Sequence, residues 1–155
     1  RLGSILEDVV GWPGLGEVRP GVNLAASHDD WEHDYRAPDV IVFLRDSQAR
    51  NQDTHWCGPA DFLVEIVSLG DGTRDKLPFY SRLGVRELLI VDRDPWALEL
   101  LRWRDGALVP VGRSTVKERG RLVSEVVPLV FELAAAQPRP AIRVTHTESG
   151  RTWDV

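Results

Sequence analysis

A glutamate stands inside an otherwise apolar segment of this sequence. Glu65 interrupts the run Phe62–Val67, whose other residues are all hydrophobic. A continuous apolar run of this length is typical of a strand that is buried on both faces. A buried carboxylate is costly unless it is paired with a cation or bound to a metal ion. Glu65 is therefore the first candidate for chemistry.

Two further residues can meet Glu65. Asp39 follows Pro38 and opens the apolar run Val40–Leu44, so a neighbouring strand would bring a second carboxylate close. Lys76 opens a predicted helix, and its side chain can reach back over the strand end. Two carboxylates with water completing the shell suit a hard cation such as Mg²⁺, for which Mn²⁺ can substitute. The lysine charge could then offset the carboxylates and stabilise a phosphate.

Two other charged residues are candidates for the edge of such a site. Asp61 precedes Glu65 by four residues, so strand alternation places both on one face, about 13 Å apart. That separation is too large for one shared ion, which leaves Asp61 as an outer member at most. Arg74 is a candidate for contact with a phosphate, and a surface charge pair is its alternative role.

A plain ion pair is the alternative to a metal site. Glu65 could pair with Lys76 or Arg74 without any cation, and Asp39 could cap a turn. The pattern alone leaves both interpretations open.

Regular elements must position these residues. The apolar runs Val40–Leu44, Phe62–Val67 and Leu88–Val91 predict buried strands. The sequence predicts a helix over Lys76–Leu83, with Thr73 or Asp75 as its cap, Pro78 in its first turn and Gly84 at its end. The remaining predictions are a helix over Arg1–Val10, a strand within Glu17–Leu24, a hairpin of Ala97–Trp103 and Ala107–Val111 turned at Asp105-Gly106, and strands within Leu122–Leu133 and Ala141–Thr147.

The order of these elements predicts one α/β domain over residues 1–155. Strand, helix and strand followed by a hairpin favour a mixed sheet flanked by helices, with additional hairpin strands. The sequence lacks methionine, so we expect the N-terminal segment to be incomplete.

Composition restricts the function classes. The net charge of −5 and the pI of about 5.4 argue against a general nucleic-acid binder. They are compatible with an enzyme that binds phosphates locally through Arg, Lys and a bound cation. A single cysteine, Cys57, fits a reducing cytoplasm. No apolar run approaches the roughly 18 residues that a membrane span needs.

Several other polar and aromatic residues have simpler interpretations. The histidines and acids of His28–Asp34 lack a spacing that fixes metal geometry, so we expect a solvated loop. His55-Trp56-Cys57 is expected near the mouth of the site, where a substrate contact is one interpretation. Tyr80 and Trp96 are predicted to lie in the core.

The central segment resembles the Uma-type putative restriction endonuclease family of the PD-(D/E)xK nuclease superfamily. The similarity runs from about Arg36 to Trp103 and depends on the order of its motifs. The segments that carry it are Arg36–Val40, Gly58–Ser68, Asp75–Glu87 and Leu88–Asp92. The later Val127–Leu129 and Trp153 are also similar to some members.

This resemblance implies a restriction-endonuclease-like fold and specific roles. Asp39 matches the first metal-binding aspartate, and Glu65 matches the acidic residue of (D/E)xK. Val67 stands where the lysine of that element is expected, and Uma-type proteins are similar in having their lysine on the following helix, where Lys76 stands. Glu7 and Asp8 match the position of a further helix acid without a firm assignment.

The resemblance also implies the reaction, which is hydrolysis of a phosphodiester by Asp39, Glu65 and Lys76. The metal would be Mg²⁺, with the carbonyl of Ile66 as an extra ligand. DNA is the implied substrate, although the sequence itself does not choose between DNA and RNA. A homodimer is one oligomeric state to consider. The alternatives are a catalytically inactive nuclease fold with a binding or structural role, and a hydrolase of small phosphate esters.

Overall fold

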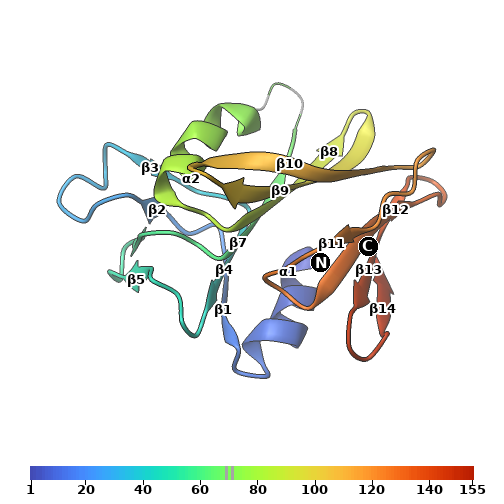
Figure 1. Cartoon of the computed structure of the whole chain (residues 1–155), viewed down its shortest axis with the longest axis horizontal. Helices are drawn as coiled ribbons and strands as arrows, with labels where there is room; N and C mark the ends of the chain where they lie inside the picture. The colour runs from blue at the N-terminus through green and yellow to red at the C-terminus, as the bar shows by residue number, and fades with distance from the viewer. Residues whose placement is uncertain (69, 71) are drawn as a thin grey trace.

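A six-stranded mixed sheet forms the centre of the computed structural model, which describes residues 1–68, 70 and 72–155 (Figure 1). Strands β7 and β8 run parallel, and every other pair of neighbours in the sheet is antiparallel. The strands lie in the order β1 (Gly16–Pro20), β4 (Val40–Leu44), β7 (Phe62–Ile66), β8 (Glu87–Arg93), β9 (Trp96–Arg104) and β10 (Ala107–Thr115). The predicted mixed α/β sheet is confirmed.

Both faces of the central strands are buried, as their continuous apolar runs predict. β4 pairs with β7 in a register that sets Val40 opposite Val64 and Ile41 opposite Leu63. Side chains alternate along a strand, so these two pairs face opposite sides of the sheet. Val40 and Val64 accordingly belong to one apolar cluster, and Ile41 and Leu63 belong to the other.

The first cluster is covered by the chain ends (Figure 1). Helix α1 (Leu2–Leu6) continues as a π-helical turn over Glu7–Gly11. A second sheet packs beside it, in the order β11 (Leu122–Val123), β12 (Leu129–Ala134), β13 (Ala141–His146) and β14 (Thr152–Asp154). The strand region predicted over Leu122–Leu133 is thus two strands, and β14 was not predicted.

The second cluster lies under helix α2 (Leu77–Leu83) and a small sheet. The small sheet has the order β3 (Tyr35–Arg36), β2 (Leu24–Ala25), β6 (Trp56–Cys57) and β5 (Arg50–Asn51). The sequence predicted no strand at β3, β5 or β6, because a two-residue strand has no periodicity to detect. The small sheet completes the α2 side of the molecule.

The start and end of α2 follow ordinary helix rules, with one exception. Pro78 lies in the first turn, and Gly84 ends the helix with a left-handed φ of +81°. A 3₁₀ turn over Thr73–Lys76 precedes the helix. The N-cap residues of the turn and of α2 are Gly72 and Lys76, and neither makes a side-chain cap hydrogen bond. The predicted cap by Thr73 or Asp75 is therefore wrong. Between β7 and this turn, positions 69 and 71 lie outside the described residues.

The hairpin of β9 and β10 confirms its predicted turn. Asp105 and Gly106 both have positive φ, of 49° and 90°, which is the conformation that a two-residue type I′ turn requires. Within the part of the chain that the structure describes, no helix is long and apolar enough to cross a membrane.

A buried carboxylate ties the central sheet to the second sheet. Glu87 on β8 is 0% exposed. Its Oε1 accepts hydrogen bonds from the Arg102 guanidinium at 2.8 Å and from the Glu125 amide at 3.0 Å. Its Oε2 accepts from the Ser124 hydroxyl at 2.5 Å. These contacts hold the segment after β11 against β8 and β9.

We expect Glu87→Ala to lower the free energy of unfolding by about 3–5 kcal/mol, because it removes one partner of a buried ion pair. Urea denaturation measures the change. Glu125→Ala is the matched control, since Glu125 contacts the same Arg102 at 2.9 Å from a side chain that is 66% exposed. It should cost no more than about 1 kcal/mol. Equal losses in the two variants would contradict the role of Glu87.

Candidate active site

Glu65 is held between the central sheet and α2. It occupies β7 on the face that α2 covers and is 1% exposed. The Lys76 ammonium donates to both carboxylate oxygens, at 3.1 Å and 3.0 Å. The Tyr80 hydroxyl donates to Oε1 at 2.6 Å. The carboxylate is therefore satisfied from one side, by the 3₁₀ turn and the helix that follows it.

The surroundings of Glu65 act on its pKa in opposite directions. Burial is the largest effect and raises the pKa of Glu65 above its ordinary value. The hydrogen bonds from Tyr80 and Lys76 and the charge of Lys76 lower it, whereas the charge of Asp39 raises it. The net direction is upward. Burial and Glu65 likewise raise the pKa of Tyr80, which stays protonated and acts as a donor.

Asp39 lies just before β4, beside the end of β7. The register of Val40 with Val64 continues to place Asp39 opposite Glu65. Its Oδ2 accepts a hydrogen bond from the Ile66 amide at 2.7 Å. The amide and carbonyl of one strand residue point to the same edge, so the Ile66 carbonyl also points toward Asp39. The side chain of Asp39 is exposed, which leaves this end of the site open to solvent.

Tyr80 was missed as a site residue, because an apolar setting made it look like core. It is 0% exposed, yet its hydroxyl contacts Glu65. A signal was present in the spacing: Tyr80 follows Lys76 by four residues, and residues four apart share one face of a helix. A buried hydroxyl also requires a hydrogen-bond partner.

The structure brings Asp39, Glu65, Ile66 and Lys76 together, whereas the two outer candidates contact other charged residues. Asp61 lies at the other end of β7, where it accepts from the Leu44 amide at 2.8 Å and from Arg86 at 3.1 Å. Arg74 donates to Asp92 at 3.2 Å and to Glu99 at 3.0 Å. Both residues thus have structural ion pairs.

The histidine-rich segment forms an aromatic stack. The rings of Trp31 and His55 lie 4.4 Å apart, and those of His28 and His55 lie 5.2 Å apart. Burial and the neighbouring His28 lower the pKa of His55. Among the described residues, no group of three or more His, Cys, Asp or Glu side chains is placed to hold a metal ion. The two carboxylates at Asp39 and Glu65 would need other oxygen ligands to complete a shell.

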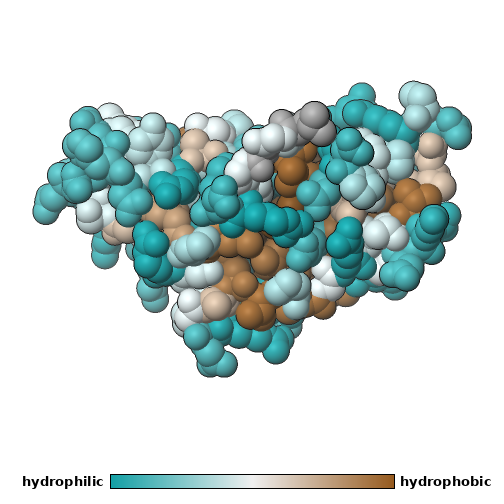
Figure 2. All heavy atoms as spheres, turned by 90° about the horizontal axis from the view of Figure 1, so that it is seen from above, coloured by the Kyte–Doolittle hydropathy of each residue, from teal (hydrophilic) through white to brown (hydrophobic). Residues whose placement is uncertain are grey.

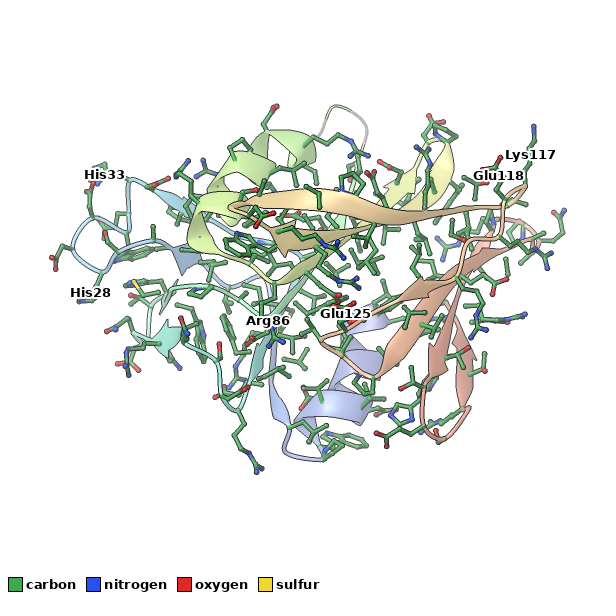
Figure 3. The ribbon with its side chains drawn as sticks, in the orientation of Figure 1. His28, His33, Arg86, Lys117, Glu118 and Glu125 are labelled. Carbon is green, nitrogen blue, oxygen red and sulfur yellow. The ribbon has the colours of Figure 1, made fainter. Side chains whose placement is uncertain are left out.

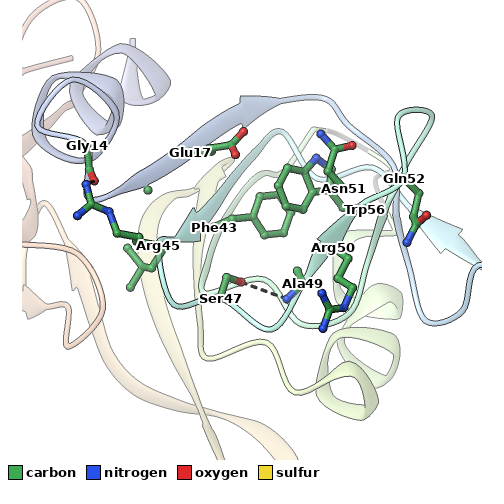
Figure 4. A pocket seen from close by; sticks show the side chains of 12 residues that line it. Gly14, Glu17, Phe43, Arg45, Ser47, Ala49, Arg50, Asn51, Gln52 and Trp56 are labelled. Atoms are coloured by element: carbon green, nitrogen blue, oxygen red, sulfur yellow. Dashed lines mark hydrogen bonds between the residues drawn. The ribbon is translucent and has the colours of Figure 1, made fainter.

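A hollow of about 600 Å³ lies at the far end of β4 from Asp39 (Figure 4). Its floor includes the stacked rings of Phe43 and Trp56, whose centroids are 3.8 Å apart. Arg45 at its rim turns toward the carbonyl of Gly14, to which it donates. This hollow contains none of the residues that meet at Glu65.

We expect Tyr80→Phe to make stability more dependent on pH. Losing the donor raises the pKa of Glu65 further, because the hydrogen bond favours the ionised form. A carboxyl with a raised folded pKa favours folding while it is protonated, and this contribution is lost as pH rises through the folded pKa. The window therefore extends upward from the ordinary value of 4.5. The variant should lose about 1.5–3 kcal/mol of unfolding free energy at about pH 8 and less at pH 4.5.

Urea denaturation at the two pH values measures this difference. Tyr35→Phe is the control, because Tyr35 is the other tyrosine and is 40% exposed. It should change stability by no more than about 0.5 kcal/mol at either pH. A Tyr80→Phe loss that is independent of pH would show that Glu65 does not titrate in this window.

Comparisons with known proteins bear on the family and the fold. The family model of Uma2, described as putative restriction endonuclease, matches residues 1–136. No curated protein matches the sequence. A crystal structure of a putative nuclease belonging to DUF820 from Anabaena variabilis is similar, with a TM-score of 0.53 and 14% identity over 70% of this chain and 62% of that chain. That likeness shows the fold alone, and the chain spans less than two thirds of that nuclease. Because the family match covers most of the sequence, the chain belongs to the Uma2 family of putative restriction endonucleases.

Proposed function

We propose that this chain is a Mg²⁺-dependent endonuclease that hydrolyses phosphodiester bonds of DNA, with Asp39, Glu65 and Lys76 as its catalytic residues. The observation that carries the proposal is the contact of Lys76 with both oxygens of a buried glutamate, beside a second carboxylate. Membership of the Uma2 family supports the reaction class.

The oxygen donors at this edge fit a hard divalent cation. Asp39 has an exposed carboxylate, and only its Oδ2 accepts a hydrogen bond among the described residues. Glu65 contributes a second carboxylate, and the Ile66 carbonyl points toward the same edge. Mg²⁺ prefers oxygen ligands and keeps several waters, so two carboxylates and a carbonyl suffice for the protein's share.

The Lys76 ammonium has two alternative positions in this proposal. In the structure its ammonium lies on Glu65. A cation at Glu65 would compete with that ammonium, because both need the same oxygens. Lys76 is 25% exposed at its side chain, so it can turn toward a bound phosphate.

Each residue then has a separate task. When bound, Mg²⁺ supplies Lewis-acid chemistry, polarising the phosphoryl group and acidifying water. Asp39 and Glu65 hold the cation, and Tyr80 fixes the orientation of Glu65 through Oε1. Lys76 stabilises charge that grows on the phosphate in the transition state. The open side at Asp39 admits the substrate.

A catalytically inactive nuclease fold is the second candidate, and one observation favours it. Both oxygens of Glu65 are already engaged by the chain's own donors, which is a complete ion pair without a cation. The acidic net charge of −5 also weakens general DNA binding. A single domain over residues 1–155, a cytoplasmic location and a homodimer stay predictions.

We expect Lys76→Ala to lower the rate of plasmid cleavage in Mg²⁺ or Mn²⁺ by about 10²–10³-fold, as loss of one charge-stabilising group does elsewhere. Binding of Mn²⁺ should persist, because a charged lysine offers no lone pair. Plasmid nicking measures the rate, and Mn²⁺ titration measures the binding.

Lys117→Ala is the matched control for this prediction. Lys117 is the other lysine of the chain, and it lies exposed at the end of the molecule opposite His28 (Figure 3). Its loss should leave cleavage unchanged. Wild-type rates in Lys76→Ala would remove Lys76 from the mechanism, and absence of cleavage in the wild type would favour the inactive fold. Cleavage of a small phosphate ester, without cleavage of DNA, would identify the chain as a hydrolase of small phosphate esters.

A further inference from the structure

Two arginines share one aromatic ring near the candidate active site. The guanidinium carbon of Arg36 lies 4.7 Å from the centre of the Phe79 ring, and that of Arg82 lies 5.7 Å from it. Both distances are within the range of cation–π attraction. Phe79 itself is buried and fixed by the core. The ring therefore restrains both guanidiniums, which we call the arginine pair.

The arginine pair already holds one anion. Asp34 places its Oδ1 3.5 Å from Arg36 and its Oδ2 3.5 Å from Arg82. Arg36 also donates to the carbonyl of Tyr35 at 2.7 Å. The two contacts to Asp34 are long for hydrogen bonds, and all three side chains are at least one-third exposed. The Asp34 carboxylate is thus held loosely between two guanidiniums.

The arginine pair lies beside the catalytic residues. Arg36 precedes Asp39 by three residues, so their Cα atoms are at most about 10 Å apart. Phe79 and Tyr80 are neighbours on α2, and Tyr80 contacts Glu65. The charge of Arg36 also reaches Tyr80, whose pKa it lowers against the larger effect of burial. An anion at the arginine pair would therefore lie next to the reacting phosphate.

The loop that carries Asp34 is acidic. Asp29, Asp30, Glu32 and Asp34 all fall within residues 28–34. The loop projects between β2 and β3, at the end of the molecule marked by His28 and His33 (Figure 3). That end is covered by hydrophilic side chains (Figure 2). A carboxylate on such a loop resembles a phosphate in charge and in its oxygen acceptors.

We propose that Arg36 and Arg82 bind a backbone phosphate of DNA next to the cleavage site, and that Asp34 occupies this phosphate position in the free protein. The inference rests on the proposed nuclease function. Arginine suits the task, because its planar fork binds phosphate oxygens and stacks on aromatic rings. The contact is to the backbone and is therefore independent of sequence. Asp34 lowers affinity by competing with the phosphate.

DNA binding without cleavage tests this inference. Fluorescence anisotropy with two unrelated labelled duplexes, in EDTA and over about 50–200 mM KCl, gives the affinity and its salt slope. Arg82→Gln should reduce the slope by about one and weaken binding to both duplexes alike. Asp34→Asn should strengthen binding about two- to fivefold, because a surface ion pair of this kind is weak.

Two controls separate the proposed contacts from general charge effects. Arg121→Gln removes an exposed arginine from outside the pair and should leave the slope unchanged. Asp30→Asn removes an equal charge from the same loop, but Asp30 contacts His33 at 2.8 Å, so it should strengthen binding less than Asp34→Asn. In the background of Arg36→Gln and Arg82→Gln, the gain from Asp34→Asn should disappear.

The possible failures are distinguishable. If the wild type cleaves DNA but Arg82→Gln and Arg121→Gln have equal slopes, the arginine pair does not bind phosphate and the nuclease proposal stands. If Asp34→Asn gains no more than Asp30→Asn, Asp34 does not compete. If neither the wild type nor Asp34→Asn binds or cleaves DNA, the nuclease proposal fails and this inference fails with it.

Discussion

Burial of the Glu65 carboxylate is the constraint on which the rest of the site depends. A carboxylate that is 1% exposed must be satisfied by donors or by a cation. The chain supplies two donors, Lys76 from the 3₁₀ turn at 3.0–3.1 Å and Tyr80 from α2 at 2.6 Å. Their placement requires the 3₁₀ turn, the helix and Gly84, which together set α2 over the end of β7.

The same constraint links the site to its neighbours. The pairing of β4 with β7 sets Asp39 against the Ile66 amide. The charge of Asp39 opposes ionisation of Glu65, whereas that of Lys76 favours it. A divalent cation would relieve the repulsion and free the ammonium. The carboxylate of Glu65 thus belongs both to the ion pair in the structure and to the proposed metal site, and Lys76 and the cation are alternative partners for it.

The sequence predicted features that leave a strong local pattern. The runs at β4, β7 and β8, the Asp105-Gly106 turn and the interrupting Glu65 are patterns of this kind. Tyr80 was predicted to lie in the core, because a tyrosine that is buried for packing and one that is buried for function have the same apolar neighbours in the sequence. Strands such as β2 and β6 have only two residues, which is too short for a detectable pattern. Asp61 lies on the predicted face of its strand, but its carboxylate contacts Arg86. Tertiary contacts decide these cases, and a single sequence does not display them.

A crystal structure with Mn²⁺ tests the central claim most directly. The claim is that Asp39 and Glu65 share a divalent cation that competes with Lys76. We predict an anomalous difference peak between the two carboxylates, about 2.0–2.2 Å from oxygen ligands that include the Ile66 carbonyl, with the Lys76 ammonium withdrawn from Glu65. A structure at saturating Mn²⁺ with no peak there, and with Lys76 still on both Glu65 oxygens, would contradict the account.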